Sequence, residues 1–320
     1  MTLSPQERWF VDRGLAYFAD PVRATVWRRL ALPRLVPALL VLFLLSVSAG
    51  VLTTKLIPGE QLAWVGFTVG AQLFGVLCLA YALFALRAGS ITRWAIGRTF
   101  DSLWQLYPLV TKALPMLLVF ITFLFINTEV WQVATTLNAS TMASVVSTFA
   151  LLAVLFLYAR LAKVVGHYDD KLDGQRVCDA CAGTPFEAYA DLDEQPGIDE
   201  PLDRLERANL VLAMLVTQVI QVLLLSLAVM AFFLLFGMLT INADVVKSWT
   251  GHPPTPILWG LLNQEILRVS VFLSGFAALY FTVTAVNDET YRQEFFGSLE
   301  DETEQALAAR EVYRAIQRAD

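Results

Sequence analysis

The sequence predicts an all-α fold, a bundle of six transmembrane helices with amphipathic interfacial helices and with both termini in the cytoplasm. Three observations predict it. Only 16% of the 320 residues are charged and the mean hydropathy is +0.57, whereas a soluble domain is about 25% charged. Six runs reach the ~20 mostly apolar residues that a helix needs to cross a bilayer. Lys and Arg gather on alternate sides of these runs.

The six apolar runs define the predicted spans. They cover residues 35–54, 62–86, 109–128, 142–165, 209–241 and 267–286. The fifth is long enough to tilt or to extend beyond the bilayer. The first long run begins near Leu35, after a segment that is itself predicted helical, so we expect a retained membrane anchor rather than a cleaved signal peptide.

The basic residues orient the bundle. Of the 23 Lys and Arg residues, 20 lie on the side that holds both termini and 3 on the other. Because cytoplasmic segments are enriched in Lys and Arg, this asymmetry predicts a multi-pass protein of the plasma membrane with cytoplasmic termini. The tryptophans agree as an aromatic belt, with Trp64, Trp131, Trp249 and Trp259 near the outer interface and Trp27, Trp94 and Trp104 near the inner one.

The chain therefore divides into five segments. They are N-terminal cytoplasmic helices (1–34), spans one to four (35–166), an acidic cytoplasmic loop (167–208), spans five and six (209–286) and a cytoplasmic helical tail (287–320). The stretch from 167 to 203 holds eleven acidic and two basic residues and is predicted to be irregular in large part.

Several helices outside the spans are predicted. Ser4-Pro5-Gln6-Glu7 fits a capping box, and residues 90–107 are amphipathic. We expect both helices on the inner membrane surface, with packing on the protein's own cytoplasmic loops as the alternative. The tail from Ser298 has one apolar face, which either packs under the bundle, as we favour, or forms a coiled coil. A further helix is predicted to begin at Thr255-Pro256 and to lead into the last span.

Small residues recur at helical spacing in three spans, which lets helices approach closely in lipid. They predict packing within the bundle or between subunits. The residues are Ser46, Gly50, Gly66, Gly70, Gly75, Ser270, Ser274 and Ala278.

No catalytic, cofactor-binding or metal-binding pattern stands out, so we predict no enzyme and no cofactor. The chain lacks GxSxG, HExxH and P-loop patterns. Cys178 and Cys181 form a CxxC without the further ligands that zinc requires, which favours two reduced thiols without a role over a zinc site or a redox pair. The loop beginning at Asp169 lacks the Glu at its twelfth position that a calcium loop needs.

Four uncharged polar residues within the spans form a candidate polar path: Gln72, Thr217, Gln218 and Gln221. Gln218 and Gln221 are three residues apart and so share a helix face. These side chains either line a wet path or hydrogen-bond neighbouring helices. No charge lies at the centre of a span, which disfavours a proton-coupled pump.

Two outward tips share the pattern Ile-Asn-x-acid-Val, at residues 126–130 and 241–245. Either chance or a parallel repeat of two halves explains the match. Because we expect Glu129 and Asp244 at helix C-termini, where an acid is unfavourable, the pattern predicts a compensating cation. Asn127, Glu129, Asn242 and Asp244 are therefore a candidate outer funnel, with simple solvation of the acids as the alternative.

One resemblance accompanies these patterns. It rests on the strings Phe125-Ile126-Asn127-Thr128-Glu129-Val130-Trp131-Gln132, Tyr280-Phe281-Thr282-Val283 and Asp288-Glu289-Thr290-Tyr291-Arg292. They resemble a group of actinobacterial integral membrane proteins without an established activity. The resemblance implies a bacterial source of that kind and no mechanism.

Two functions are compatible with these sequence features. One is a channel or uncoupled transporter for an ion or small solute, with a homo-oligomer left open. The other is a membrane scaffold whose acidic loop and tail recruit a cytoplasmic protein. A membrane enzyme ranks third. The lipid bilayer is the expected partner, and nucleic acid is excluded because the chain has no basic face.

Overall fold

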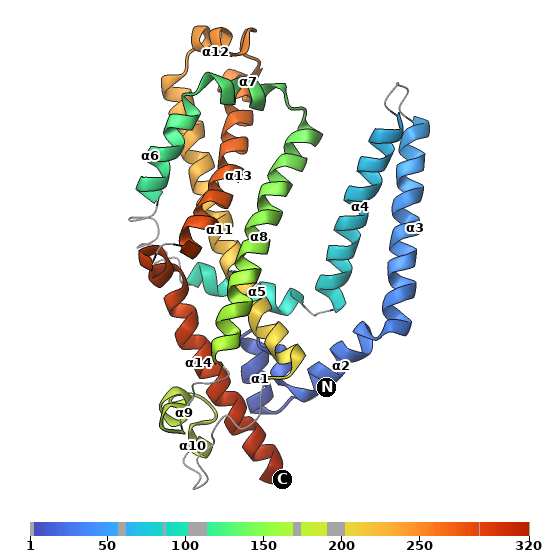
Figure 1. The fold of residues 1–320 in the computed structure, drawn as a ribbon, viewed down its shortest axis with the longest axis vertical. Helices are drawn as coiled ribbons and strands as arrows, with labels where there is room; N and C mark the ends of the chain where they lie inside the picture. The colour runs from blue at the N-terminus through green and yellow to red at the C-terminus, as the bar shows by residue number, and fades with distance from the viewer. Residues whose placement is uncertain are drawn as a thin grey trace. The chain divides into compact units, whose positions relative to one another are not determined.

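The computed structural model describes residues 3–56, 62–85, 88–101, 114–168, 174–190, 202–287 and 289–319. These residues are almost entirely helical, with fourteen α-helices and two strands of two residues each (Figure 1). The chain forms two compact units. The first holds Met1–Trp94 and Asp203–Asn209, and the second holds Ala95–Leu202 and Leu210–Asp320.

Four helices in the described part of the chain are long and apolar enough to cross a membrane: α3 (Leu32–Leu56), α8 (Ala139–Tyr168), α11 (Arg204–Thr240) and α13 (Gln264–Asn287). A fifth arises if α6 (Leu114–Phe125) and α7 (Thr128–Thr136), bent by 75° at the break between them, form one span. The second predicted span is helical as α4 (Leu62–Ala85). The all-α class is confirmed, whereas the count of six spans stays a prediction.

The N-terminal segment of the first unit packs against other parts of the chain. It comprises α1 (Pro5–Asp12), the 3₁₀ turn η1 (Ala16–Phe18) and α2 (Asp20–Leu30). The predicted capping box is confirmed, because Ser4 N donates to Glu7 Oε2 (2.8 Å) and Glu7 N donates to Ser4 Oγ (3.2 Å). Phe10, Tyr17 and Phe18 are fully buried, so packing on the protein's own segments accounts for these aromatic residues.

The start of α11 anchors this segment through two buried polar side chains. Asn209 Oδ1 accepts from Tyr17 N (2.7 Å), and Asn209 Nδ2 donates to Gly14 O (2.8 Å). Glu206, one turn earlier on the same face, accepts from Arg23 Nη1 (2.6 Å) and is 1% exposed. Buried polar groups need such partners, so these bonds determine how the N-terminal segment packs on α11.

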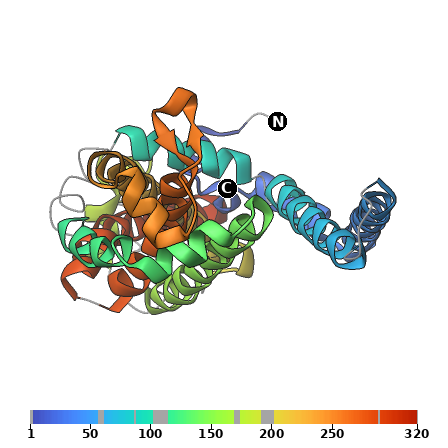
Figure 2. The ribbon, with the colours of Figure 1, turned by 90° about the horizontal axis from the view of Figure 1, so that it is seen from above.

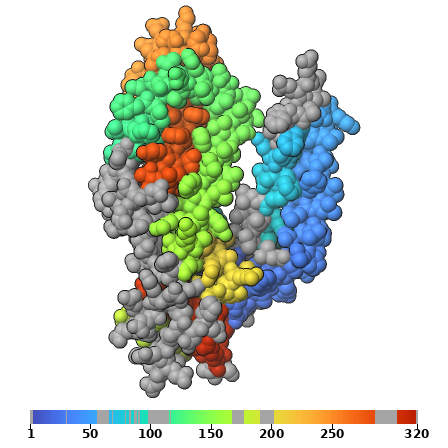
Figure 3. All heavy atoms as spheres, in the orientation of Figure 1, coloured from blue at the N-terminus to red at the C-terminus, as the bar shows by residue number. Residues whose placement is uncertain are grey.

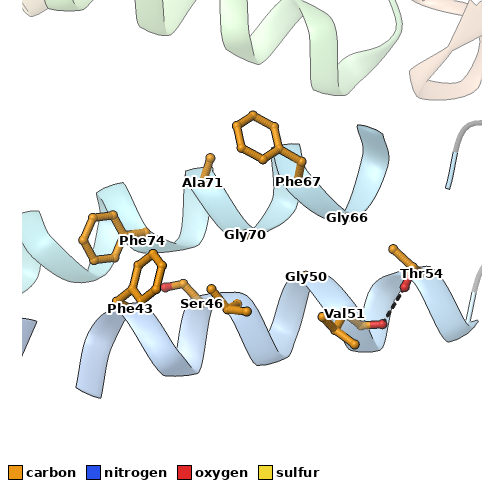
Figure 4. A pocket seen from close by; sticks show the side chains of 11 residues that line it. Phe43, Ser46, Gly50, Val51, Thr54, Gly66, Phe67, Gly70, Ala71 and Phe74 are labelled. Atoms are coloured by element: carbon orange, nitrogen blue, oxygen red, sulfur yellow. Dashed lines mark hydrogen bonds between the residues drawn. The ribbon is translucent and has the colours of Figure 1, made fainter. Parts of the chain in front are cut away.

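The hairpin of α3 and α4 uses its small residues internally. A Cβ atom on Gly50 would lie 2.6 Å from Gly66 O, and one on Gly66 would lie 2.7 Å from Gly50 O. Figure 4 shows these two glycines facing each other, with Phe43 and Phe74 together further along. The stripe of small residues therefore serves packing within one hairpin. It leaves a cavity of about 390 Å³ that is bounded by Phe43, Gly50, Gly66, Phe67, Gly70 and Phe74.

Gly50→Ala should destabilise the hairpin by about 1–3 kcal/mol, because its Cβ would meet a backbone oxygen that cannot move aside. Gly75→Ala is the matched control. A Cβ there meets nothing within 4 Å, so the better helix propensity of Ala should add about 0.5–1 kcal/mol. Thermal unfolding of the purified protein in detergent measures both. Equal effects of the two substitutions would contradict the close contact.

α13 is the central helix of the second unit (Figure 2). Within its apolar stretch of 18 residues, 50% of α13 is buried, whereas the corresponding share is 28% for α11 and 17% for α8. Phe149 of α8 packs between Phe272 (5.9 Å) and Phe276 (6.1 Å), and Phe120 of α6 stacks on Tyr280 (4.8 Å). Neighbours on several sides thus hold α13.

Three helices of the second unit outside its apolar spans pack on one another. The tail forms α14 (Glu289–Ala319), which contacts α9 (Gly174–Cys181) and α10 (Glu187–Ala190) of the acidic loop. Ala306, Ala309 and Tyr313, which belong to the predicted apolar face, are buried, and Thr303 Oγ1 lies 3.9 Å from Met214 Sδ of α11. The apolar face is therefore occupied within the chain. Residues 169–173 and 191–201 of the loop lie outside the described residues.

The helix predicted from Thr255 is wrong. Pro256–Ile257 (β1) pairs antiparallel with Leu262–Asn263 (β2), and the 3₁₀ turn η4 (Leu258–Gly260) joins the strands. The residues before Pro254 and Pro256 are biased towards extended backbone, and Gly260 takes a positive φ of 86°. A hairpin thus precedes α13 in place of a helical turn.

Candidate functional site

Both tips that carry the Ile-Asn-x-acid-Val pattern are helix–Asn–helix junctions. α6 gives way to α7 at Asn127, whose Oδ1 accepts from Glu129 N (2.8 Å) and Val130 N (3.3 Å). α11 gives way to α12 (Ala243–Thr250) at Asn242, whose Oδ1 accepts from Val245 N (2.9 Å). In each tip an Asn side chain satisfies N–H groups that the first helical turn leaves unpaired. The shared pattern is therefore an N-cap signal.

The expectation that Glu129 and Asp244 lie at helix C-termini is wrong. Each acid lies in the first turn of the helix that follows the Asn. The partial positive charge of a helix N-terminus favours an acid there by about 0.3–1 kcal/mol. Both side chains are exposed, so neither acid requires a compensating cation. No cluster of three metal-ligating side chains occurs among the residues that the structure describes.

The two tips nevertheless lie together. α12 contacts α7, and the rings of Trp131 and Trp249 meet at 5.3 Å. Figure 3 shows α12 lying over α7 at one end of the second unit. Trp131 is fully buried and donates from Nε1 to Phe125 O (2.6 Å). The bent junction of α6 and α7 is thus closed by an aromatic contact, and an outer funnel around the acids stays a prediction.

The four residues of the candidate polar path have different surroundings. Gln72 lies on α4 in the first unit and is exposed. Thr217 and Gln218 are buried on α11, and Gln221 is half-buried on the same helix. Thr217 Oγ1 donates to Ala213 O of its own helix (3.0 Å). The α11 residues are therefore the ones that the second unit brings into its interior.

α13 carries a line of hydroxyl side chains that sequence reasoning noted in part. Ser270, Ser274 and Thr282 are buried, and their spacings of four and eight residues place them towards one side of the helix. Ser226 Oγ of α11 donates to Ser274 O (2.9 Å), and Gly237 lies against Ile266. This antiparallel register brings Gln218 and Gln221 level with Thr282. We call Thr217, Gln218, Gln221, Ser226, Ser270, Ser274 and Thr282 the polar seam.

Two oxygen atoms of the polar seam retain hydrogen-bonding capacity. Within the described residues, Gln221 Oε1 and Ser270 Oγ are buried and have no hydrogen-bond partner. A buried polar atom without a partner costs about 1–3 kcal/mol. Such atoms mark positions where water or a polar solute would be stabilised.

The CxxC pair lies on α9, with one thiol in the protein interior. Cys178 is half-buried and Cys181 is fully buried. Burial, with a smaller contribution from the neighbouring Cys178, raises the pKa of Cys181 to about 11. Because the thiolate is the reactive form, this burial opposes a redox role. It also contradicts the prediction that both thiols are loop residues without a role, since Cys181 packs in a core.

Cys181→Ser should lower stability by about 1–3 kcal/mol, because it places a hydroxyl in an apolar site without a partner. Cys178→Ser, at the more exposed position of the same helix, should change stability by about 0.5 kcal/mol or less. Thermal unfolding in detergent compares the two variants. The packing role of Cys181 would be contradicted if both substitutions were equally mild.

Three other buried charged residues, Glu265, Arg310 and Glu311, were not among the predicted site residues. Glu265 is 3% exposed, and its two carboxylate oxygens accept hydrogen bonds from Thr255 N (3.0 and 3.2 Å). Arg310 and Glu311 pair with each other inside the packed face of α14. Burial raises the pKa of Glu311, and Arg310 opposes that shift. A charged residue at the end of an apolar run was the available hint for Glu265, and for the α14 pair there was none.

No protein-family model, no curated protein and no solved structure matches the chain.

Proposed function

We propose that the chain is a six-span plasma-membrane protein with cytoplasmic termini that lets a small polar solute or ion pass along the polar seam between α11 and α13. The observation that carries this proposal is the line of buried hydroxyl and amide side chains inside the second unit. Membrane character itself follows from the long apolar helices. The path and its substrate class are the proposed part.

The length of the polar seam supports a path for a solute rather than an isolated polar contact between helices. Ser270 and Thr282 are twelve residues apart on α13, which corresponds to ~18 Å of helix axis at about 1.5 Å per residue. The hydrocarbon core is about 30 Å thick. The seam therefore extends over more than half of that thickness, and Gln221 Oε1 and Ser270 Oγ offer acceptor sites within it.

The charge pattern favours uncoupled passage. Beyond Arg268, α13 carries no charged residue, and α11 carries none after Arg207. Ion-coupled transporters usually keep an ionisable group within the membrane. A neutral seam is suited to a neutral solute, or to an ion that carbonyl and hydroxyl oxygens can solvate.

The scaffold function is the second candidate, and a different observation favours it. α14 is 31 residues long and packs on α9 and α10, so the proposed cytoplasmic side carries an ordered helical element. In addition, Thr217 and Thr282 donate to carbonyls of their own helices. Hydroxyl groups engaged in this way also occur where helices only pack.

Flux through the reconstituted protein tests the proposal. Light scattering of liposomes reports glycerol and urea entry, and planar-bilayer conductance in KCl reports ions. Wild-type protein should exceed protein-free membranes with at least one of these probes. The triple variant Gln221→Leu, Ser270→Ala, Thr282→Val should lose most of that flux, because it removes polar atoms from the seam.

The matched control is Leu227→Met on the exposed face of α11, which should leave flux unchanged. A correctly folded triple variant with full flux would exclude the polar seam as the path. Wild-type protein that passes none of the probes would contradict transport and leave the scaffold function.

A further inference from the structure

An uncharged hairpin stands at the start of α13 and turns large apolar side chains outward. The eleven residues from Pro253 to Asn263 include no charged residue. At the hairpin loop, Leu258 is 60%, Trp259 98% and Leu261 74% exposed. Trp131 and Val246 at the same end of the unit are instead fully buried. Exposed apolar clusters of this kind mark interaction surfaces.

The hairpin is held firmly at its base. Gln264 N donates to Thr255 O (2.9 Å), and Glu265 of the first turn of α13 accepts Thr255 N. Leu262 of β2 is buried. The exposed side chains are therefore presented by an ordered element, and Figure 2 shows the hairpin at the edge of the second unit with its loop turned away from the helices.

The loop backbone is in a conformation that these residues rarely adopt. Leu258 and Trp259 have positive φ values of 50° and 58°, a region that L side chains with bulk disfavour. Strain of this kind persists where the surroundings or a function maintain it. Here the positive φ values coincide with two large apolar side chains that the chain leaves mostly exposed.

We propose that this loop inserts Leu258, Trp259 and Leu261 into the interfacial region of the outer leaflet and so fixes the depth of α13 in the bilayer. The loop ends three residues before α13 begins at Gln264, so its apolar tip lies at the level where the span enters the membrane. Trp has an amphipathic ring that prefers the headgroup level, and the uncharged composition avoids any charge in the acyl region.

Fluorescent labelling in lipid nanodiscs tests this inference. A protein without native cysteines receives a single Cys at position 259, which carries the environment-sensitive dye NBD. Lipids brominated on the acyl chain should quench the dye strongly, and aqueous iodide should have little effect. Leu261→Cys serves as a second variant that retains Trp259. Both positions are exposed, so the fold should tolerate them.

Two control positions separate this inference from the membrane assignment itself. NBD at Leu227, exposed on the α11 span, should be quenched by brominated lipid, and NBD at Ser248, exposed on α12, should be quenched by iodide. If position 227 is not quenched by brominated lipid, the membrane assignment fails. If positions 227 and 248 behave as expected but 259 and 261 are quenched by iodide, the hairpin stays in water and the inference is overturned. Protection of 259 and 261 from both quenchers would also overturn it, since a protein then covers the loop.

Discussion

Trp131→Ala should destabilise the protein by about 3–5 kcal/mol, the range for removing a fully buried aromatic side chain from a core. Trp131 is 0% exposed and packs edge-on against Phe125 (5.7 Å) and Trp249 (5.3 Å). Its Nε1–H also satisfies the carbonyl of Phe125, near the C-terminus of α6. The substitution therefore removes apolar contact and leaves a buried carbonyl without this donor. Thermal unfolding in detergent measures the loss.

Trp131→Phe separates the two contributions. It keeps an aromatic ring beside Phe125 and Trp249 but lacks the donor, so we expect a loss between that of Trp131→Ala and that of wild type. The neighbouring residue Gln132 is exposed, and Gln132→Ala should change stability by about 0.5 kcal/mol or less. If Trp131→Ala were as mild as the Gln132 control, α7 would not depend on this contact.

The two Ile-Asn-x-acid-Val tips illustrate what can and cannot be predicted from sequence. Apolar runs of sufficient length predicted helices where α3, α4, α6, α8, α11 and α13 occur. The pattern Ile-Asn-x-acid-Val was recognised as special, but its meaning depended on whether a second helix follows. Because the Asn ends one helix and caps the next, the acid lies at the positive N-terminal end of the second helix and not at the negative C-terminal end of the first. Hydropathy alone contains no information on that reversal.

Contacts between residues far apart in sequence explain the other differences. The buried hydroxyl side chains of α13 belong to the polar seam because α11 lies antiparallel to α13, as the hydrogen bond from Ser226 Oγ to Ser274 O shows. Cys181 becomes a core residue only because α14 covers α9. Neither partner is adjacent in the chain. The Pro-rich stretch before α13 is a different case, because Pro253, Pro254 and Pro256 already disfavoured a continuous helix.

Asn209→Leu should cost about 2–6 kcal/mol, because it removes both hydrogen bonds that join the N-terminal segment to α11. Leu approximates the size of Asn but neither donates nor accepts. Tyr17 N–H and Gly14 C=O would then be buried without this partner, at about 1–3 kcal/mol each. The N-terminal segment should detach before the rest unfolds, since its fixed packing depends on these bonds and on the pair of Arg23 with Glu206. Limited proteolysis in detergent should therefore cleave within residues 3–30 in the variant and not in wild type.

Two further substitutions make this test specific. Asn209→Asp retains the acceptor for Tyr17 N–H but places a carboxylate against Gly14 O and one turn from the buried Glu206, so its loss of stability should be at least as large as that of Asn209→Leu. Arg204 lies at the start of the same helix and is exposed, and Arg204→Ala should leave both the cleavage pattern and the unfolding temperature close to wild type. Wild-type resistance of Asn209→Leu to protease would mean that the apolar contacts of Tyr17, Val22 and Leu205 hold the segment without the Asn209 bonds. The same apolar residues would then be the ones to substitute, and the buried Asn would be a consequence of the packing rather than its cause.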